Sequence, residues 1–197
     1  MAKSYSGITG VDQFKYMIHG EGEVQSTTPE AIKYLQEIEL EMEEEIVRAY
    51  GDNVTAELAK SVGNVTLTSS FHRLPLEDKA KLFGLKVQDG LTFAGGNNGV
   101  AYAACMFART TEQGTEYVGL FKGMFKMSNI EGATKEDEIE FQSEESEAEF
   151  MPVEVEGVEG VQSFVLGYDE KGSTANRDKI HRLVFGVAHP DATPVTP

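Results

Sequence analysis

The feature that most constrains the fold is a strict alternation of acidic and apolar residues from position 37 to position 43. Successive side chains of a β-strand point to opposite faces, so this pattern predicts a strand with one apolar face and one acidic face. The apolar positions are Ile38, Leu40 and Met42, and the acidic positions are Glu37, Glu39, Glu41 and Glu43.

A helix is the alternative for this stretch, because apolar residues also recur there at spacings of three and four. These residues are Leu35, Ile38, Met42 and Ile46. A helix leaves Leu40 and Val47 outside its apolar stripe, and it brings glutamates together four residues apart, which is unfavourable. The strand is therefore favoured. Near Glu44 and Glu45 the alternation slips, as it does at a bulge or bend.

The remaining pattern predicts a mainly β fold with one short helix. The helix is expected at about 75–84, because Pro75 stands at its start, acidic residues fill its first turn and Gly84 is a suitable C-cap. Apolar or alternating stretches predict strands. They lie at 12–22, 46–50, 54–61, 63–71, 100–110 and 116–128, and at both ends of 161–187.

A chain of 197 residues with 40% apolar residues suits one domain. We expect a single β-rich domain over residues 12–187, with a Gly- and Asn-rich loop at 88–99. The N-terminal arm at 1–11 and the Pro-rich C-terminal tail at 188–197 flank it. Arms and exposed strand edges of this kind suit self-assembly, in which they become ordered against a neighbouring subunit.

The charge of the chain bears on its partners. Lys and Arg number 17 and Asp and Glu number 33, which gives a formal net charge of −16. Such a surface repels phosphates at long range, which argues against a protein that binds DNA by counterion release. It remains compatible with a protein that handles DNA without binding it. The sequence predicts neither a signal peptide nor a membrane helix.

No catalytic, metal or cofactor site is predicted, so we expect the protein not to be an enzyme. The histidines are not paired in the sequence, and the single cysteine, Cys105, lies in an apolar run typical of a buried residue. Phosphate-binding and nucleophile motifs are missing as well. The histidines are His19, His72, His181 and His189.

Six segments occur in an order that resembles the major tail protein (tail tube) family of long, non-contractile-tailed bacteriophages, especially those that infect Gram-positive hosts. They are "AYGDN" (49–53), "GNVTLT" (63–68), "LPLEDKAKLFGLKVQDG" (74–90), "AYAACMF" (101–107), "YVGLFKGMF" (117–125) and "ATKEDEIEFQ" (133–142). The match is less clear from Glu144 onward.

This resemblance implies a β-barrel or sandwich of two packed sheets with one flanking helix, and hexameric rings that stack into a tube. The tube belongs to the virion tail, is assembled in the host cytoplasm and conducts genomic DNA without binding it specifically. The implied partners are further copies of the chain, the tape-measure protein, the tail terminator and the distal tail proteins. The resemblance implies no catalysis and no membrane partner.

Two groups of residues follow as candidates for this function. We expect Glu37, Glu39, Glu41 and Glu43 to face the channel, and the alternative is that they face outward solvent or a neighbouring ring. We expect contacts between subunits or rings at Gly95, Asn97 and Asn98. Three aromatic residues share a strand face by period 2 and are expected either at such an interface or in the core; they are Tyr117, Phe121 and Phe125. The arms are further candidates for contacts between rings.

Two other functions stay open. A tail-terminator or head–tail joining protein with a related fold would form one ring and not polymerise. An acidic β-sandwich that binds a ligand such as a carbohydrate is the other, although the chain has no Trp for a sugar platform.

Overall fold

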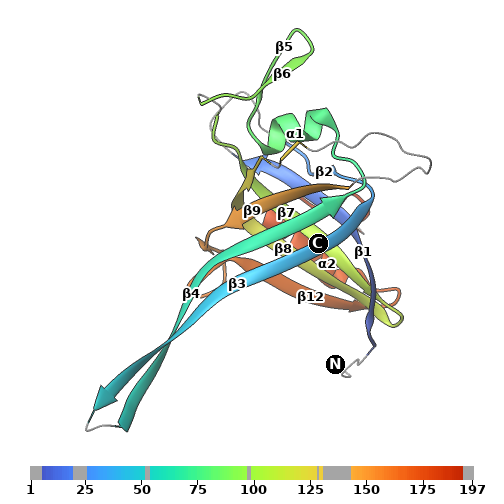
Figure 1. Ribbon diagram of the computed structural model, residues 1–197. Helices are drawn as coiled ribbons and strands as arrows, with labels where there is room; N and C mark the ends of the chain where they lie inside the picture. Colours follow the sequence, from blue (N-terminus) through green and yellow to red (C-terminus); the bar gives the residue numbers. More distant parts are fainter. Residues whose placement is uncertain are drawn as a thin grey trace, which may run out of the picture.

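Antiparallel strands make up most of the protein. A computed structural model describes residues 6–19, 26–51, 54–96, 99–127, 129–130 and 143–192, and the side chains at 45, 47, 49–51 and 54–62 lie outside this description. The predicted mainly β class is confirmed, with two short helices beside the strands (Figure 1). The elements are β1 (Ile8–His19), β2 (Glu30–Ala31), β3 (Leu35–Gly51), β4 (Val54–Phe71), α1 (Leu76–Leu82), β5 (Lys86–Gln88), β6 (Leu91–Phe93), β7 (Tyr102–Thr111), β8 (Gly114–Lys126), β9 (Glu144–Phe150), β10 (Val153–Glu154), β11 (Val161–Gln162), β12 (Phe164–Glu170) and α2 (Ala175–Phe185).

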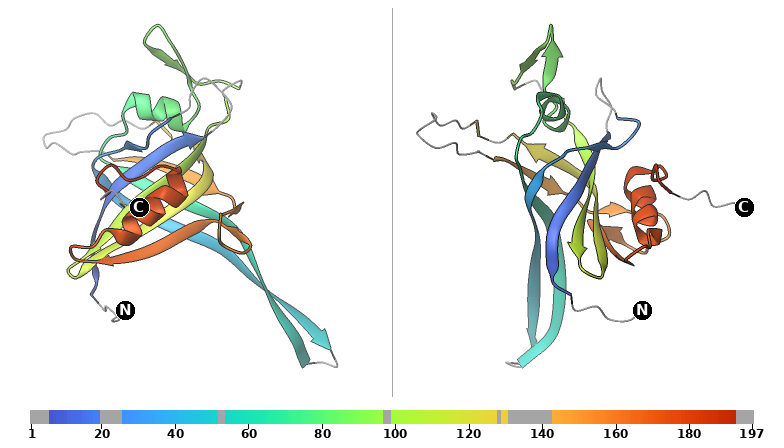
Figure 2. Two further views of the ribbon diagram at one scale, coloured as in Figure 1. Left: turned by 180° about the vertical axis from the view of Figure 1, so that it is seen from behind. Right: turned by 90° about the vertical axis from the view of Figure 1, so that its right-hand side faces the viewer.

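The main sheet folds over on itself because it forks at β8. Its order is β2-β1-β7-β8-β9-β4-β3, with β12 paired to the first half of β8 and β9 paired to the last residues of β8. The strands β1, β7 and β8 thus form one layer, and β3 and β4 lie across from them (Figure 2). The core between the layers is apolar and includes Phe14, Leu67, Phe71, Leu120 and Phe150, all 0% exposed.

The predicted strand at 37–43 is confirmed as part of β3, which pairs with β4 in register Glu39 to Thr68 and Leu40 to Leu67. The register shifts between Met42 and Glu44, where the alternation in the sequence slips. Met42 faces Val65 and Glu44 faces Val62, so the extra residue lies in β4.

The strands β3 and β4, of 17 and 18 residues, form a long hairpin whose end projects away from the other strands (Figure 1). On β3, Met42 is 38% exposed and Ile46 is 62% exposed. Both residues occupy the inner face of β3, but they lie beyond the end of the core and are therefore exposed. The two strands predicted at 54–61 and 63–71 are one continuous strand, β4.

The prediction that Tyr117, Phe121 and Phe125 share a strand face is wrong. Leu120 pairs with Cys105 while Gly123 pairs with Ala103, so β8 has one extra residue between these pairs. A bulge of this kind reverses which face the following residues occupy. Tyr117 and Phe121 therefore pack on the outer side of the sheet, whereas Phe125 packs in the core between the layers.

Three further expectations differ from the structure. Residues 8–11, predicted as part of an arm, belong to β1 because they pair with the end of β7. The loop predicted at 88–99 begins as the hairpin of β5 and β6. The strand predicted at the end of 161–187 is the helix α2 instead. The helix predicted at 75–84 is confirmed as α1.

The second helix, α2, packs against the outer face of the sheet because two glycines leave room for it. A Cβ atom at Gly119 of β8 would lie 2.5 Å from Val184 and 2.8 Å from Ile180. One at Gly167 of β12 would lie 2.8 Å from Ile180. Ile180 and Val184 are four residues apart, so both reach the sheet from one face of the helix.

Substitution Gly119→Ala should destabilise the fold by roughly 1–3 kcal/mol, because the new methyl group overpacks the contact between α2 and the sheet. Chemical denaturation followed by circular dichroism measures this change. Gly96→Ala is the matched control, since a Cβ atom there meets nothing within 4 Å. Equal unfolding midpoints for the two variants would contradict the close packing at Gly119.

Candidate functional site

The most distinctive surface is a row of carboxylates across β3, β4 and β9. Opposed residues of antiparallel strands point to the same face. Glu39 is opposite Thr68, which is in turn opposite Glu147, and Glu41, Thr66 and Glu149 form the next row. The carboxylates are all exposed. We call this surface the carboxylate face; its members are Glu37, Glu39, Glu41, Glu43, Glu145, Glu147 and Glu149.

The same strands explain why the carboxylates lie together. The alternate residues of β3, β4 and β9 point inward, where Leu40, Leu67 and Ala148 form one row of the core. Burial of these side chains fixes which face of each strand is outside. On β4 the outer positions are Thr66, Thr68 and Ser70, which keep the carboxylates of the two neighbouring strands apart.

Few groups on this face compensate the negative charge. Lys126 of β8 lies 2.6 Å from Glu147. The Asn64 amide donates a hydrogen bond of 2.6 Å to Glu149. The hydrogen bond to Glu147, with the nearby negative charges of Glu147 and Glu149, raises the pKa of Lys126. Within the described ranges, no group of three or more His, Cys, Asp or Glu residues could hold a metal ion. The carboxylate face is thus a surface that repels other anions.

The predicted acidic face of β3 supplies four of the seven carboxylates of this surface. Glu37, Glu39, Glu41 and Glu43 lie in solvent on one side of the strand, as the alternation indicates. The glutamates of β9 were not predicted to belong to this surface. Their signal is the stretch "EESEAEF" at 144–150, in which glutamates alternate with the buried Ser146, Ala148 and Phe150.

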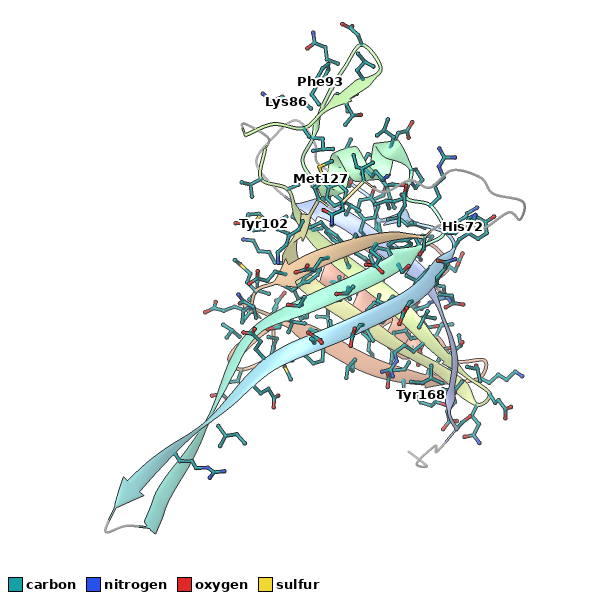
Figure 3. The ribbon with its side chains drawn as sticks, in the orientation of Figure 1. His72, Lys86, Phe93, Tyr102, Met127 and Tyr168 are labelled. Atoms are coloured by element: carbon teal, nitrogen blue, oxygen red, sulfur yellow. The ribbon has the colours of Figure 1, made fainter. Side chains whose placement is uncertain are left out.

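The residues predicted for contacts between subunits are scattered. Tyr117, Phe121 and Phe125 are 7%, 8% and 7% exposed within the chain, so they are core residues. Gly95 is exposed and follows the hairpin of β5 and β6, which carries Lys86 and Phe93 away from the sheet (Figure 3). Asn97 and Asn98 lie outside the described residues.

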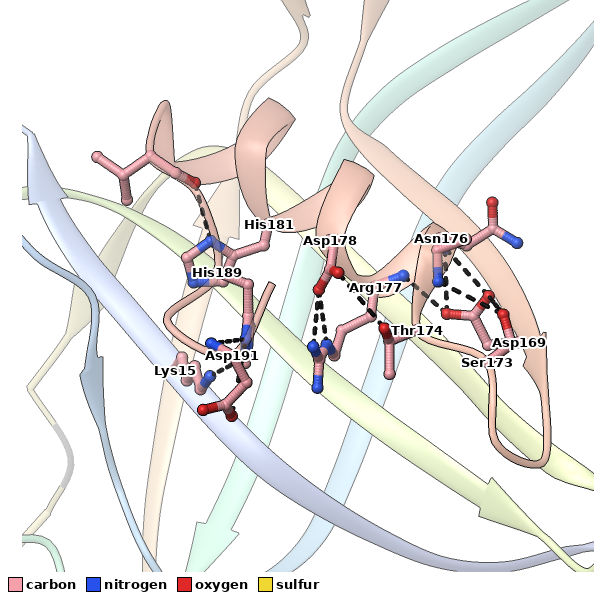
Figure 4. A network of polar contacts seen from close by, with 12 residues as sticks. Lys15, Asp169, Ser173, Thr174, Asn176, Arg177, Asp178, His181, His189 and Asp191 are labelled. Carbon is pink, nitrogen blue, oxygen red and sulfur yellow. Dashed lines mark hydrogen bonds and ion pairs between the residues drawn. The ribbon is translucent and has the colours of Figure 1, made fainter. Parts of the chain in front are cut away.

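The side of the molecule opposite the carboxylate face carries α2 and a polar network (Figures 2 and 4). Asp169 of β12 is 3% exposed and accepts hydrogen bonds from the backbone amides of Asn176 at 3.0 Å and Arg177 at 2.9 Å. A carboxylate at this position stabilises the free amides and the positive end of the helix dipole.

Burial raises the pKa of the Cys105 thiol well above its ordinary value, as expected for a cysteine in a core.

No protein-family description and no curated protein matches the chain. Among solved structures, it is similar to a chain of a cryo-EM structure of the anti-feeding prophage (AFP) baseplate, 6-fold symmetrised. The identity is 10% and the TM-score is 0.39, with 85% of this chain and 97% of that chain covered. A likeness of this size assigns neither a family nor a function. None of the described helices is long and apolar enough to cross a membrane.

Mutual repulsion on the carboxylate face predicts a salt-dependent stability change. The double substitution Glu39→Gln with Glu41→Gln should raise the thermal midpoint in about 20 mM salt, and the gain should largely disappear in about 500 mM salt because counterions screen the charges. Differential scanning fluorimetry at the two salt concentrations measures the effect. Glu112→Gln, in the exposed turn between β7 and β8, is the control and should change little. A gain that is equal at both salt concentrations would argue against repulsion.

Proposed function

We propose that the chain is a self-assembling structural subunit of a phage tail tube, in which the carboxylate face lines the channel for DNA. The observation that carries this proposal is the carboxylate face itself, built from three adjacent strands. It supplies a continuous wall of negative charge, which repels DNA phosphates and lets the duplex pass without adhesion. The ordered likeness of segments within 49–142 to the tail tube family supports the same assignment.

The long hairpin supplies a route to assembly. Among the described strands, β3 lies at the edge of the sheet, and β4 pairs with β9 only from Val65 to Phe71. Between Val65 and the end of the hairpin, no other described strand pairs with the outer edge of β3 or of β4. Such edges accept strands of another chain. When identical chains join through two different surfaces, each chain is rotated relative to its neighbour. The chains close into a ring when a whole number of these rotations makes a full turn.

Hexameric rings that stack, a place in the virion tail, and contacts with tape-measure, terminator and distal tail proteins belong to this proposal. Of the predicted arms, residues 1–7 and 193–197 remain candidates for contacts between rings, together with Gly95. A single-ring terminator or joining protein would use the same edges without stacking. We expect no catalysis.

The assembly state tests the proposal directly. Purified protein at increasing concentration should form hollow tubes or stacked rings in negative-stain electron microscopy, with a matching rise in light scattering. Stable rings that never stack would support the terminator or joining function instead. A monomer that persists both alone and with added distal tail proteins would contradict the tube, because the distal proteins supply the initiator that some tubes need.

Charge reversal tests the position of the carboxylate face. Tubes of the variant Glu39→Lys with Glu41→Lys should retain at least about fivefold more nuclease-protected duplex DNA than wild-type tubes at low salt, because lysines in the channel attract phosphates. The protected DNA is counted per subunit after nuclease digestion. Glu112→Lys tubes are the control for charge outside the proposed channel. Equal protection in the two variants would place the carboxylate face elsewhere on the tube.

A further inference from the structure

A cluster of basic groups holds α2 and the segment after it on the outer side of the sheet (Figure 4). We call Lys15, Arg177, His181 and His189 the basic cluster. The Lys15 Nζ atom of β1 lies 2.8 Å from Nε2 of His189. The rings of His181 and His189 are 4.8 Å apart between centroids. The two histidines are 1% and 7% exposed. Histidines that are eight residues apart in sequence and unpaired in any motif thus meet in the fold.

The contacts of His189 require a neutral ring. Its Nδ1 atom lies 3.1 Å from the backbone N–H of Asp191, and its Nε2 atom faces the Lys15 amine. A ring nitrogen accepts a hydrogen bond only through a lone pair. The neutral ring has one lone pair, on Nδ1 for Asp191 or on Nε2 for the Lys15 ammonium. The protonated ring has none, so protonation removes an acceptor whichever tautomer is present.

The environment of His181 also disfavours a proton. Its Nδ1 atom lies 3.0 Å from the carbonyl oxygen of Val187 and can donate to it. This leaves the lone pair on Nε2, which is buried and has no hydrogen-bond partner among the described residues. A protonated Nε2 would be a buried charged donor without an acceptor, which is costly.

The acidic groups near the cluster are either bound to other partners or exposed to solvent. On α2, Asp178 pairs with Arg177 at 2.8 Å, and Asp169 of β12 binds the amides at the start of the helix. After the helix, Asp191 is 3.9 Å from His189 and its side chain is 80% exposed. Tyr117 of β8 also lies near Arg177, and the charges of Arg177 and of Asp12 on β1 act on the pKa of the Tyr117 hydroxyl.

The direction of the pKa shifts agrees with this geometry. Burial, together with the charges of Lys15 and Arg177, lowers the pKa of His189 from 6.5 to about 4. Burial and the same two charges also lower the pKa of His181, although the hydrogen bond to Val187 opposes the shift. Burial and Arg177 lower the pKa of Lys15 as well. Each group in contact thus resists an additional positive charge.

We propose that α2 and the segment through Ala192 form an acid-released cover, which detaches from the sheet when His189 and His181 take up protons. Detachment uncovers apolar side chains on the outer face of β1, β7 and β8. These are Met17, Ala104, Met106, Tyr117 and Phe121. The core between the two layers contains no residue of the basic cluster, so the layers stay folded when the cover opens.

The pH window follows from proton uptake. In the detached segment His189 has its ordinary pKa near 6.5, and in the attached segment its pKa is about 4. Between these values the detached form binds more protons, so falling pH favours detachment. Attachment is strongest above about pH 6.5 and weakens as the pH falls toward 4.

Hydrogen exchange with mass spectrometry on the full chain tests the cover. From about pH 7.5 to about pH 5, after correction for the intrinsic rate, amides of 175–192 should lose at least about tenfold in protection while β7 and β8 keep theirs. In His189→Asn the amide oxygen can accept the Asp191 N–H but does not titrate, so most of this pH dependence should disappear. His72→Asn and His19→Asn, which change histidines outside the cluster, should behave as wild type.

A second variant is needed if His189→Asn lowers the protection of 175–192 at every pH, because its pH dependence could not then be compared with that of the wild type. Lys15→Gln removes a positive charge beside His189 and should lessen the loss of protection at about pH 5. Constant protection of 175–192 in the wild type down to about pH 5 would overturn the proposal. Equal loss of protection in β7 and β8, or an effect of His72→Asn as large as that of His189→Asn, would overturn it too.

Discussion

The structure depends on the register of β4 between its two neighbours. Leu67 packs between Leu40 and Ala148 in the core, while Thr68 lies between Glu39 and Glu147 in solvent. A slip of β4 by one residue would exchange these faces, moving Thr66 and Thr68 into the core and Val65 and Leu67 into water. One register therefore sets both the packing of the layers and the gathering of seven carboxylates, and neither can change without the other.

Bulges adapt this pattern to a sheet with two layers. The extra residue of β8 turns Phe125 into the core while Tyr117 and Phe121 remain outside under α2. At the same place Gly123 allows β9 to approach, since a Cβ atom there would lie 2.6 Å from the ring of Phe150. A side chain at position 123 would force β8 and β9 apart at the point where the sheet forks.

Much of this fold could be read from local patterns. The alternation of 37–43 predicted β3, and proline, acidic residues and glycine around 75–84 predicted α1, because each signal lies within the element that it specifies. The shift near Glu44 was visible as a break in the alternation, although the extra residue proved to lie in β4. The acidic face of β9 carries the same signal at 144–150 and could have been found.

The misses have causes outside the local sequence. The helix α2 has no capping hydrogen bond from Thr174, the residue before it; its first amides are bound by Asp169, six residues before the helix begins. The helix buries only one face, which carries Ile180 and Val184. It also comes after a strand and a polar loop, an order that suggests a second strand returning along the first. The position of Phe125 depends on a pairing with β7, and no pattern within β8 reveals that register.

The glutamates of β3 also restrict which strands can join its open edge. If two copies of β3 paired with like residues opposite each other, the five glutamates between 39 and 45 would stand carboxylate against carboxylate. That arrangement, the one amyloid fibrils use, is therefore disfavoured. A long exposed edge strand is usually an aggregation hazard. Here the charge pattern makes β3 reject copies of itself and favours a partner strand of different sequence.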